Sequence, residues 1–298
     1  MSKLLLVVVC GLFNLVVTAQ VSKIETYQFE INRAEHLLVQ KKYPEALETY
    51  QRALFISGEA FTKDIFNALS IAAELDNQER FFQILPMMAD KCIPQRKFEE
   101  IERFKSMSDD PRWAAFFSKQ NCPTGSIDKE LLSKSNKIAK RYQAKFATAI
   151  NDRQFDEAFE EWVNLVKEEG FVSEFEIGAV DFSGKTIFDE LIVDHVTKRS
   201  SDKKKTDLRG ILTQAVTDGK LAPQKAAYWI DLQNDPYKTG ILIARAFGKR
   251  PANEAKLPKS MVDKINEVRT LMHLESIEQY TTKHGLLTSS GLSGFYID

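Results

Sequence analysis

The sequence is poor in the residues that make turns. It has 13 glycines and 9 prolines among 298 residues. Few turn-formers over this length favour long helices joined by short connections and argue against a many-stranded sheet. We therefore expect an all-α fold, and the length suggests two domains.

An excess of basic charge is also missing. The chain carries 41 Lys and Arg against 42 Asp and Glu, for a formal net charge of −1. Nothing in this balance would neutralise the phosphates of a nucleic acid, so we expect no nucleic-acid partner. The hydrophobic share of 43% and the charged share of 28% are ordinary for a soluble globular protein. These shares argue against whole-chain disorder and against repeated membrane insertion.

Long apolar runs are absent except at the start of the chain. Lys3 precedes an almost wholly apolar run from Leu4 to Val17, and small residues follow up to Ala19. This order is typical of a cleaved signal peptide over residues 1–19, with Gln20 as the first mature residue. A transmembrane anchor is the alternative, but the run is short of the ~20 residues that span a bilayer. We expect an exported protein, periplasmic or secreted, with no membrane span after cleavage.

Cysteine and histidine are scarce. Removal of the signal leaves Cys92 and Cys122. An oxidising compartment permits one disulfide between them, and two separate buried thiols are the alternative. The four histidines occur singly, without the spacing of metal ligands, so neither a metal nor a cofactor is expected.

The segment from residue 27 to 57 shows helical periodicity. Two apolar stripes with helical spacing occur there: Tyr27, Ile31, Ala34 and Leu38, then Tyr43, Ala46, Tyr50 and Ala53. Lys41 and Lys42 interrupt the pattern between them. Two amphipathic helices with a tight turn predict an antiparallel hairpin.

The second of these stripes resembles the second helix of a tetratricopeptide repeat. Ala46 stands where that repeat has a small residue, and Tyr50 where an aromatic fills the gap four positions later. Gly58 departs from the repeat, which often has Pro there. Looser stripes continue the theme, and Pro86 should shorten one helix. The resemblance implies a tetratricopeptide-like helical hairpin array over residues 20–125. Its groove would use first-helix residues such as Asn32, Glu35 and Gln40 to contact a partner.

A turn-rich stretch at residues 121–130 separates this array from a second helical domain, residues 126–284. Gly170 and Pro223 predict a helix end and a helix start, Ser276 with Gln279 predicts a capping box, and Gly285 a stop. Residues 285–298, rich in Gly and Ser, are expected to form a flexible tail.

The second domain resembles a bacterial family of domains of unknown function. The residues that carry this resemblance are widely spaced: Gly178, 191–195, 215–219, 226–231, Val268 and 271–280. Asp194 and Leu232 depart from the family, which usually has Gln and Arg there. The resemblance implies no activity that can be transferred.

His195 is the best candidate for a catalytic side chain. Asp194 precedes it, and carboxylates lie one turn back, so it has the surroundings of a general base. Yet Ile187, Leu191 and His195 share one apolar stripe, which favours a buried packing role. We therefore predict an interaction or scaffolding module with a protein or peptide partner. The alternative is a hydrolase-like enzyme in the second domain that uses His195 and Asp194.

Overall fold

The computed structural model describes residues 23–119, 127–144, 152–198, 206–234, 259–290 and 292–297. Within these ranges every regular element is a helix, which confirms the all-α class. The predicted signal peptide and Cys122 lie outside the described residues. No helix in the described part is both long and apolar enough to cross a membrane.

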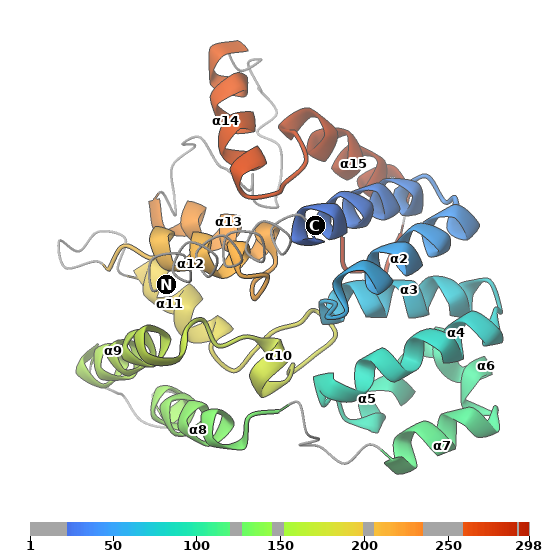
Figure 1. Ribbon diagram of the computed structural model, residues 1–298, viewed down its shortest axis with the longest axis horizontal. Coiled ribbons are helices and arrows are strands. Elements are labelled where there is room, and N and C mark those ends of the chain that lie inside the picture. The colour runs from blue at the N-terminus through green and yellow to red at the C-terminus, as the bar shows by residue number, and fades with distance from the viewer. Residues whose placement is uncertain are drawn as a thin grey trace, which may run out of the picture.

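The first part of the chain is a succession of helices that runs from the top right to the bottom right of Figure 1. A helix over residues 23–39 comes first. It is followed by α2 (Tyr43–Ser57), α3 (Thr62–Glu74), α4 (Gln78–Ile84), the 3-10 helix η1 (Leu85–Lys91), α5 (Gln95–Glu99), η2 (Glu102–Phe104), α6 (Lys105–Ser108) and α7 (Pro111–Lys119).

The apolar stripes predicted from the sequence are the core of this part. Tyr27, Ala34, Ala46 and Tyr50 are all 0% exposed. Helix α2 packs on α3, and α3 packs in turn on α4. As expected from Pro86, α4 ends at Ile84 and the chain continues as a 3-10 helix. Membership of the tetratricopeptide repeats remains a prediction.

The middle of the chain builds a second core. It contains α8 (Lys129–Ala144), α9 (Asp152–Glu169), α10 (Glu174–Ile177), α11 (Asp189–Lys198), α12 (Arg209–Thr217) and α13 (Pro223–Asn234). Trp162 and Ala158 on α9 are 0% exposed. Gly170 ends α9 with a φ of 80°, a left-handed conformation that glycine adopts without strain. Pro223 opens α13, as predicted.

Two last helices close the structure, α14 (Lys259–Leu271) and α15 (Ile277–Ser290). The predicted capping box is present: the Ser276 backbone N–H donates to Gln279 Oε1 over 3.1 Å. The Gln279 backbone N–H donates to Ser276 Oγ over 3.3 Å. The prediction that Gly285 stops this helix is wrong, because α15 continues to Ser290. Packing against the first helices outweighs the low helix propensity of one glycine.

The tail predicted to be flexible packs against the first core instead. Ile297 is 8% exposed and lies in the same apolar cluster as Tyr27 and Ala46. Figure 1 shows α15 alongside the first helices. Phe182, from the predicted second domain, joins that cluster as well. Ala222, just before α13, belongs to it too, so the first core draws on four distant stretches of the chain.

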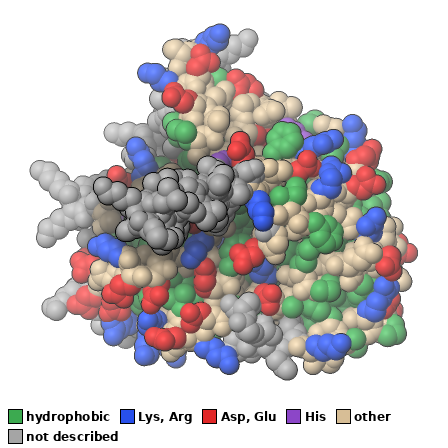
Figure 2. Space-filling model, viewed as in Figure 1, with side chains coloured by type: hydrophobic (Ala, Val, Ile, Leu, Met, Phe, Trp, Pro, Cys, Tyr) green, Lys and Arg blue, Asp and Glu red, His purple; other side chains and the backbone are tan. Residues whose placement is uncertain are grey.

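The surface that Figure 2 shows mixes charges of both signs. Lys and Arg side chains alternate with Asp and Glu over the described helices on this face. This mixture follows from the near-equal totals of basic and acidic residues.

Candidate functional site

Helix α3 is enclosed on all sides. Twelve of its 13 residues are buried, among them the polar Thr62, Lys63, Asp64, Asn67 and Ser70. Buried polar groups require partners, since an unpaired one costs free energy. We use the name covered face for the surface formed by Glu35, Lys63, Phe66, Asn67 and Arg103. Residues 174–182, α15 and residues 292–297 lie over it.

Asn67 holds the backbone of the C-terminal segment at two points. Its Nδ2 donates to the carbonyl oxygen of Tyr296 over 2.6 Å. The Tyr296 backbone N–H donates to Asn67 Oδ1 over 2.8 Å. Nδ2 also donates to the Tyr50 hydroxyl over 3.1 Å, which orients the amide from beneath. A side-chain amide that pairs with the backbone N–H and C=O of one residue can hold an extended peptide, and this pairing does not depend on the peptide's side chains.

Arg103 makes the second attachment. Its Nη2 donates to the carbonyl oxygen of Ser293 over 2.8 Å, and its guanidinium carbon lies 4.4 Å from the centre of the Phe295 ring. Gly294 lies between these contacts with a φ of 73°. A Cβ there would be 2.7 Å from Arg103 Nη2. The left-handed backbone therefore favours glycine, and any other residue would also displace the Arg103 guanidinium group.

Aromatic rings fill the remaining space. The Tyr296 ring meets Phe66 edge-on at 5.2 Å, and Phe182 stacks on Phe66 at 4.5 Å. Rings that contact at their edges or in offset stacks add to the stability that burial provides. The covered face thus binds a segment by its backbone, by one cation over a ring and by aromatic packing.

An ion cluster fastens α15 to the first helix. Lys283 Nζ lies 2.7 Å from Glu35 Oε2 and 2.6 Å from Glu275 Oε1. His36 Nε2 is 2.7 Å from Glu275 Oε2. Lys283 is 1% exposed and Glu35 is 0% exposed. Charges this deep persist only when paired, so α15 and the first helix depend on each other.

The surroundings of this cluster shift two pKa values. Burial lowers the pKa of Lys283, but the charges of Glu35 and Glu275 outweigh it, and the pKa lies above its ordinary value. Burial likewise raises the pKa of Glu275, while the hydrogen bond with His36 and the charge of Lys283 bring it below its ordinary value. Both groups are therefore held in their charged forms.

Of the predicted partner-binding residues, Glu35 is not available to a partner. It is buried and paired with Lys283. Asn32 is half-buried and Gln40 is exposed, and neither carries the contacts to the C-terminal segment described above. The residues that sequence reasoning missed are Asn67 and Arg103. A signal for Asn67 existed, because Lys63, Asn67 and Ser70 form a polar stripe with helical spacing in an otherwise apolar helix. Such a stripe ordinarily indicates a face toward water.

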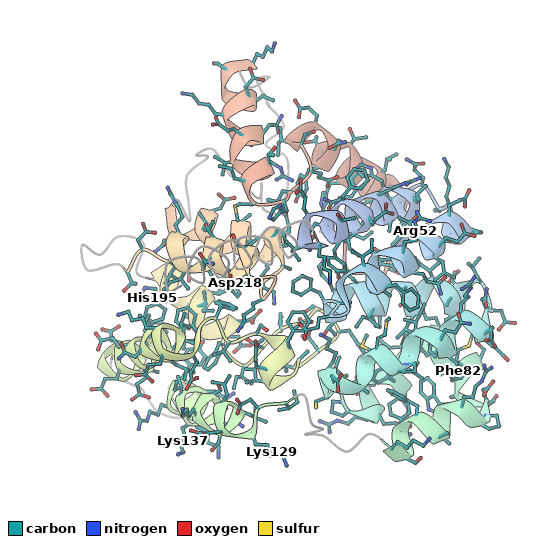
Figure 3. The ribbon with its side chains drawn as sticks, viewed as in Figure 1. Arg52, Phe82, Lys129, Lys137, His195 and Asp218 are labelled. Carbon is teal, nitrogen blue, oxygen red and sulfur yellow. The ribbon has the colours of Figure 1, made fainter. Side chains whose placement is uncertain are left out.

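His195 lies in the second core. It is 6% exposed, and its ring is parallel to Phe159 with centroids 3.4 Å apart. Figure 3 shows it beside α9 and α11, on the opposite side of the molecule from Arg52 and Phe82. Asp194 accepts a hydrogen bond from the Tyr142 hydroxyl over 3.0 Å. Burial, together with that carboxylate, raises the pKa of Tyr142 above its ordinary value. This arrangement is typical of a packing role for His195.

Cys92 takes part in a disulfide. Its predicted partner, Cys122, lies outside the described residues. No group of three His, Cys, Asp or Glu side chains suited to a metal ion occurs in the described part of the chain.

Comparison of the chain with protein-family models, with curated proteins and with solved structures finds no match in any of the three.

Proposed function

We propose that this protein is an exported interaction module whose helical hairpins bind an extended peptide on the covered face. The observation that carries the proposal is the pair of hydrogen bonds between Asn67 and the backbone of Tyr296. Both hydrogen bonds involve main-chain atoms of Tyr296, so they do not depend on which side chain that residue has. A face built in this way accepts other extended segments of similar shape.

The contacts also define the kind of segment that fits. Arg103 covers an aromatic ring, Phe66 meets a second one, and the following residue is apolar and buried. Gly294 supplies the turn that lets the backbone approach Arg103. We therefore expect a partner with a small residue followed by two aromatic residues and an aliphatic one. The chain's own residues 292–297 occupy the face in its absence.

Export is the second component of the proposal. The apolar run from Leu4 to Val17, the preceding Lys3 and the small residues that end at Ala19 support it. A disulfide at Cys92 is compatible with an oxidising compartment.

The alternative, a hydrolase-like enzyme that uses His195, has no observation in its favour. The His195 ring is stacked on Phe159 within the core. The one cavity that we describe below is lined by other residues.

An exchange experiment tests peptide binding on a protein that has already folded. A protease recognition site is inserted between Gly291 and Leu292 of the chain that begins at Gln20. After purification and cleavage, a fluorescent peptide of residues 292–298 is titrated and followed by anisotropy. We expect saturable binding that competes with the cleaved segment. Asn67→Ala should weaken it about tenfold or more, since two hydrogen bonds are lost.

Matched controls distinguish specific binding of the peptide from nonspecific binding. Asn164→Ala changes an exposed asparagine on α9 and should leave the affinity unchanged. A peptide with Gly294→Ala should bind more weakly than one with Ser293→Ala, because Ser293 uses only its backbone carbonyl. Equal affinity of the wild-type and Asn67→Ala proteins, or no binding after cleavage, would contradict the proposal.

A further inference from the structure

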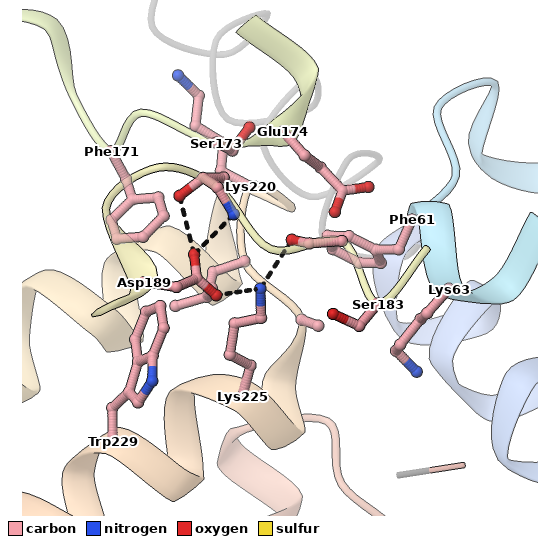
Figure 4. Close-up of a pocket in the computed structure, with 14 residues that line it drawn as sticks. Phe61, Lys63, Phe171, Ser173, Glu174, Ser183, Asp189, Lys220, Lys225 and Trp229 are labelled. Atoms are coloured by element: carbon pink, nitrogen blue, oxygen red, sulfur yellow. Dashed lines mark hydrogen bonds and ion pairs between the residues drawn. The ribbon is translucent and has the colours of Figure 1, made fainter. Parts of the chain in front are cut away.

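A cavity of about 70 Å³ lies where the first helices meet the second core. Its walls include Phe61, Glu174, Gly184, Asp189, Lys225 and Trp229. Figure 4 shows Glu174 pointing down at the upper right, near the Phe61 ring, and Lys225 pointing up from below. The rings of Phe171 and Trp229 lie at the left, beside Asp189. The cavity shares Lys63 with the covered face, but residues 292–297 do not line it. Its assignment therefore does not depend on the proposed peptide binding.

The two carboxylate oxygens of Glu174 differ in their contacts. Its Oε1 accepts from the Thr62 backbone N–H over 2.6 Å and from Thr62 Oγ1 over 2.8 Å. Lys91 Nζ is 3.4 Å from the same atom. The hydrogen bonds and the ion pair of Glu174 within the described residues all involve Oε1, and the side chain is only 6% exposed. A buried carboxylate oxygen beside a cavity is an acceptor for a ligand.

The Gly184 backbone packs closely beside the other oxygen, Oε2. A Cβ on Gly184 would lie 2.1 Å from Glu174 Oε2, and the residue has a φ of 71°. Any other residue would displace the carboxylate. The backbone at this point is therefore shaped around Oε2.

Lys225 supplies a donor on the other side. Its Nζ donates to the Gly184 carbonyl and to Asp189 Oδ2, both over 2.8 Å. Asp189 is fixed in turn by the Thr186 backbone N–H and hydroxyl. An ammonium group has three N–H donors, so one remains for a ligand.

The charges around the cavity are balanced in pairs. Lys91 pairs with Glu174, Lys225 with Asp189, Lys220 with Glu176, and Lys63, which also lines the cavity, with Asp64. A ligand with a net charge would upset this balance in a site that is partly shielded from water. A ligand with one positive and one negative group has no net charge and would preserve the balance. The volume is that of a few water molecules, so a ligand of about five or six non-hydrogen atoms suits it.

We propose that this cavity binds a small α-amino acid of the size of glycine or alanine. The ligand's ammonium group donates to Glu174 Oε2, and its carboxylate accepts from Lys225 Nζ. The rings of Phe171 and Trp229 cover its carbon atoms. Glu174 also bonds to the first turn of α3, so the ligand joins the second core to the hairpins.

Calorimetric titration of the whole mature chain with glycine and with L-alanine tests this assignment. We expect saturable binding of both. Glu174→Gln retains an oxygen for Thr62 but exchanges the other for an amide, and it should weaken glycine binding about tenfold or more. Lys225→Met should do the same from the carboxylate side. Glu168→Gln is the matched control, because Glu168 is exposed on α9 and does not line the cavity, and it should leave the affinity unchanged.

Partial ligands and folding controls complete the experiment. Glycinamide, which mimics the first residue of a peptide, and acetate should each bind more weakly than glycine. Circular dichroism establishes whether each variant is folded. If Glu174→Gln does not fold, the affinity of Lys225→Met is compared with that of the wild type instead. The proposal is overturned if glycine and alanine give no binding heat, if Glu174→Gln binds glycine as tightly as the wild type, or if acetate or glycinamide matches glycine.

Discussion

Lys283 shows how a single side chain joins distant parts of this protein. It lies between Glu35 on the first helix and Glu275 just before α15, and it is 1% exposed. Removing one partner from a buried ion pair leaves an uncompensated charge, which is far costlier than the pair itself is favourable.

We predict that Lys283→Ala lowers the free energy of unfolding by about 3–5 kcal/mol, since two carboxylates would be left buried together. Urea unfolding followed by circular dichroism measures the change. Lys264→Ala, on the exposed side of α14, should change it by less than about 0.5 kcal/mol. A loss no greater for Lys283→Ala than for this control would show that the cluster does not hold α15.

Glu275 gives this cluster a dependence on pH. Its pKa is lower in the folded protein than the ordinary 4.5, so its stabilising contribution is complete above about pH 4.5 and is lost as pH falls through the folded value. We predict that the difference in unfolding free energy between wild type and Glu275→Gln shrinks from about pH 6 to about pH 3. Urea titrations across that range measure it. A constant difference would contradict the assigned shift.

His195 is a packing residue by its surroundings, and its removal should act on stability. We predict that His195→Ala lowers the free energy of unfolding by about 2 kcal/mol, because Phe159 loses a stacked ring and a cavity is left. Lys137→Ala, exposed on α8, is the control and should have little effect. Unchanged stability of His195→Ala would instead favour a functional role for the imidazole.

At the scale of elements, the end of η1 carries a covalent link. Cys92 follows this 3-10 helix with a φ of 56°, and it forms a disulfide. A cross-link stabilises mainly because it restricts the unfolded chain.

We predict that the unfolded mature chain has no free thiol and that Cys92→Ser exposes one, at Cys122. The substitution should also lower the free energy of unfolding by about 2–4 kcal/mol. Thiol titration in denaturant and urea unfolding measure the two effects. Two free thiols in the wild type would exclude the pairing of Cys92 with Cys122.

The helices themselves followed from local pattern. Tyr27, Ala34, Ala46 and Tyr50 were predicted to share buried faces, and all are 0% exposed. The capping box at Ser276 could also be predicted from the sequence, because its two residues are only three positions apart. The end of α15 was not, since a glycine stops an isolated helix more readily than one packed on a neighbour.

At the scale of the whole molecule, the first core is completed by residues far away in sequence. Phe182 and Ile297 both belong to its apolar cluster. Chain segments that cover a core in this way must be in place before the core is closed to water.

Export remains a prediction at this scale, and it has a direct test. We predict that the full chain expressed in a bacterial host is recovered outside the cytoplasm and begins at Gln20. N-terminal sequencing and fractionation measure this. Ala19→Arg should block cleavage, because the peptidase requires a small residue there. Recovery of an uncleaved wild-type chain from the cytoplasm would contradict the prediction.

The sequence by itself determined the helical class, the buried stripes and several helix ends, because these depend on residues within a turn or two of each other. It did not reveal the candidate sites. Glu35 was expected on a groove, yet Lys283, 248 positions later, buries and neutralises it. Asn67 and Glu174 look like residues of solvated faces until Tyr296 and Gly184 are placed against them. Only the tertiary structure decided which polar side chains left water, since that depends on contacts that no local periodicity records.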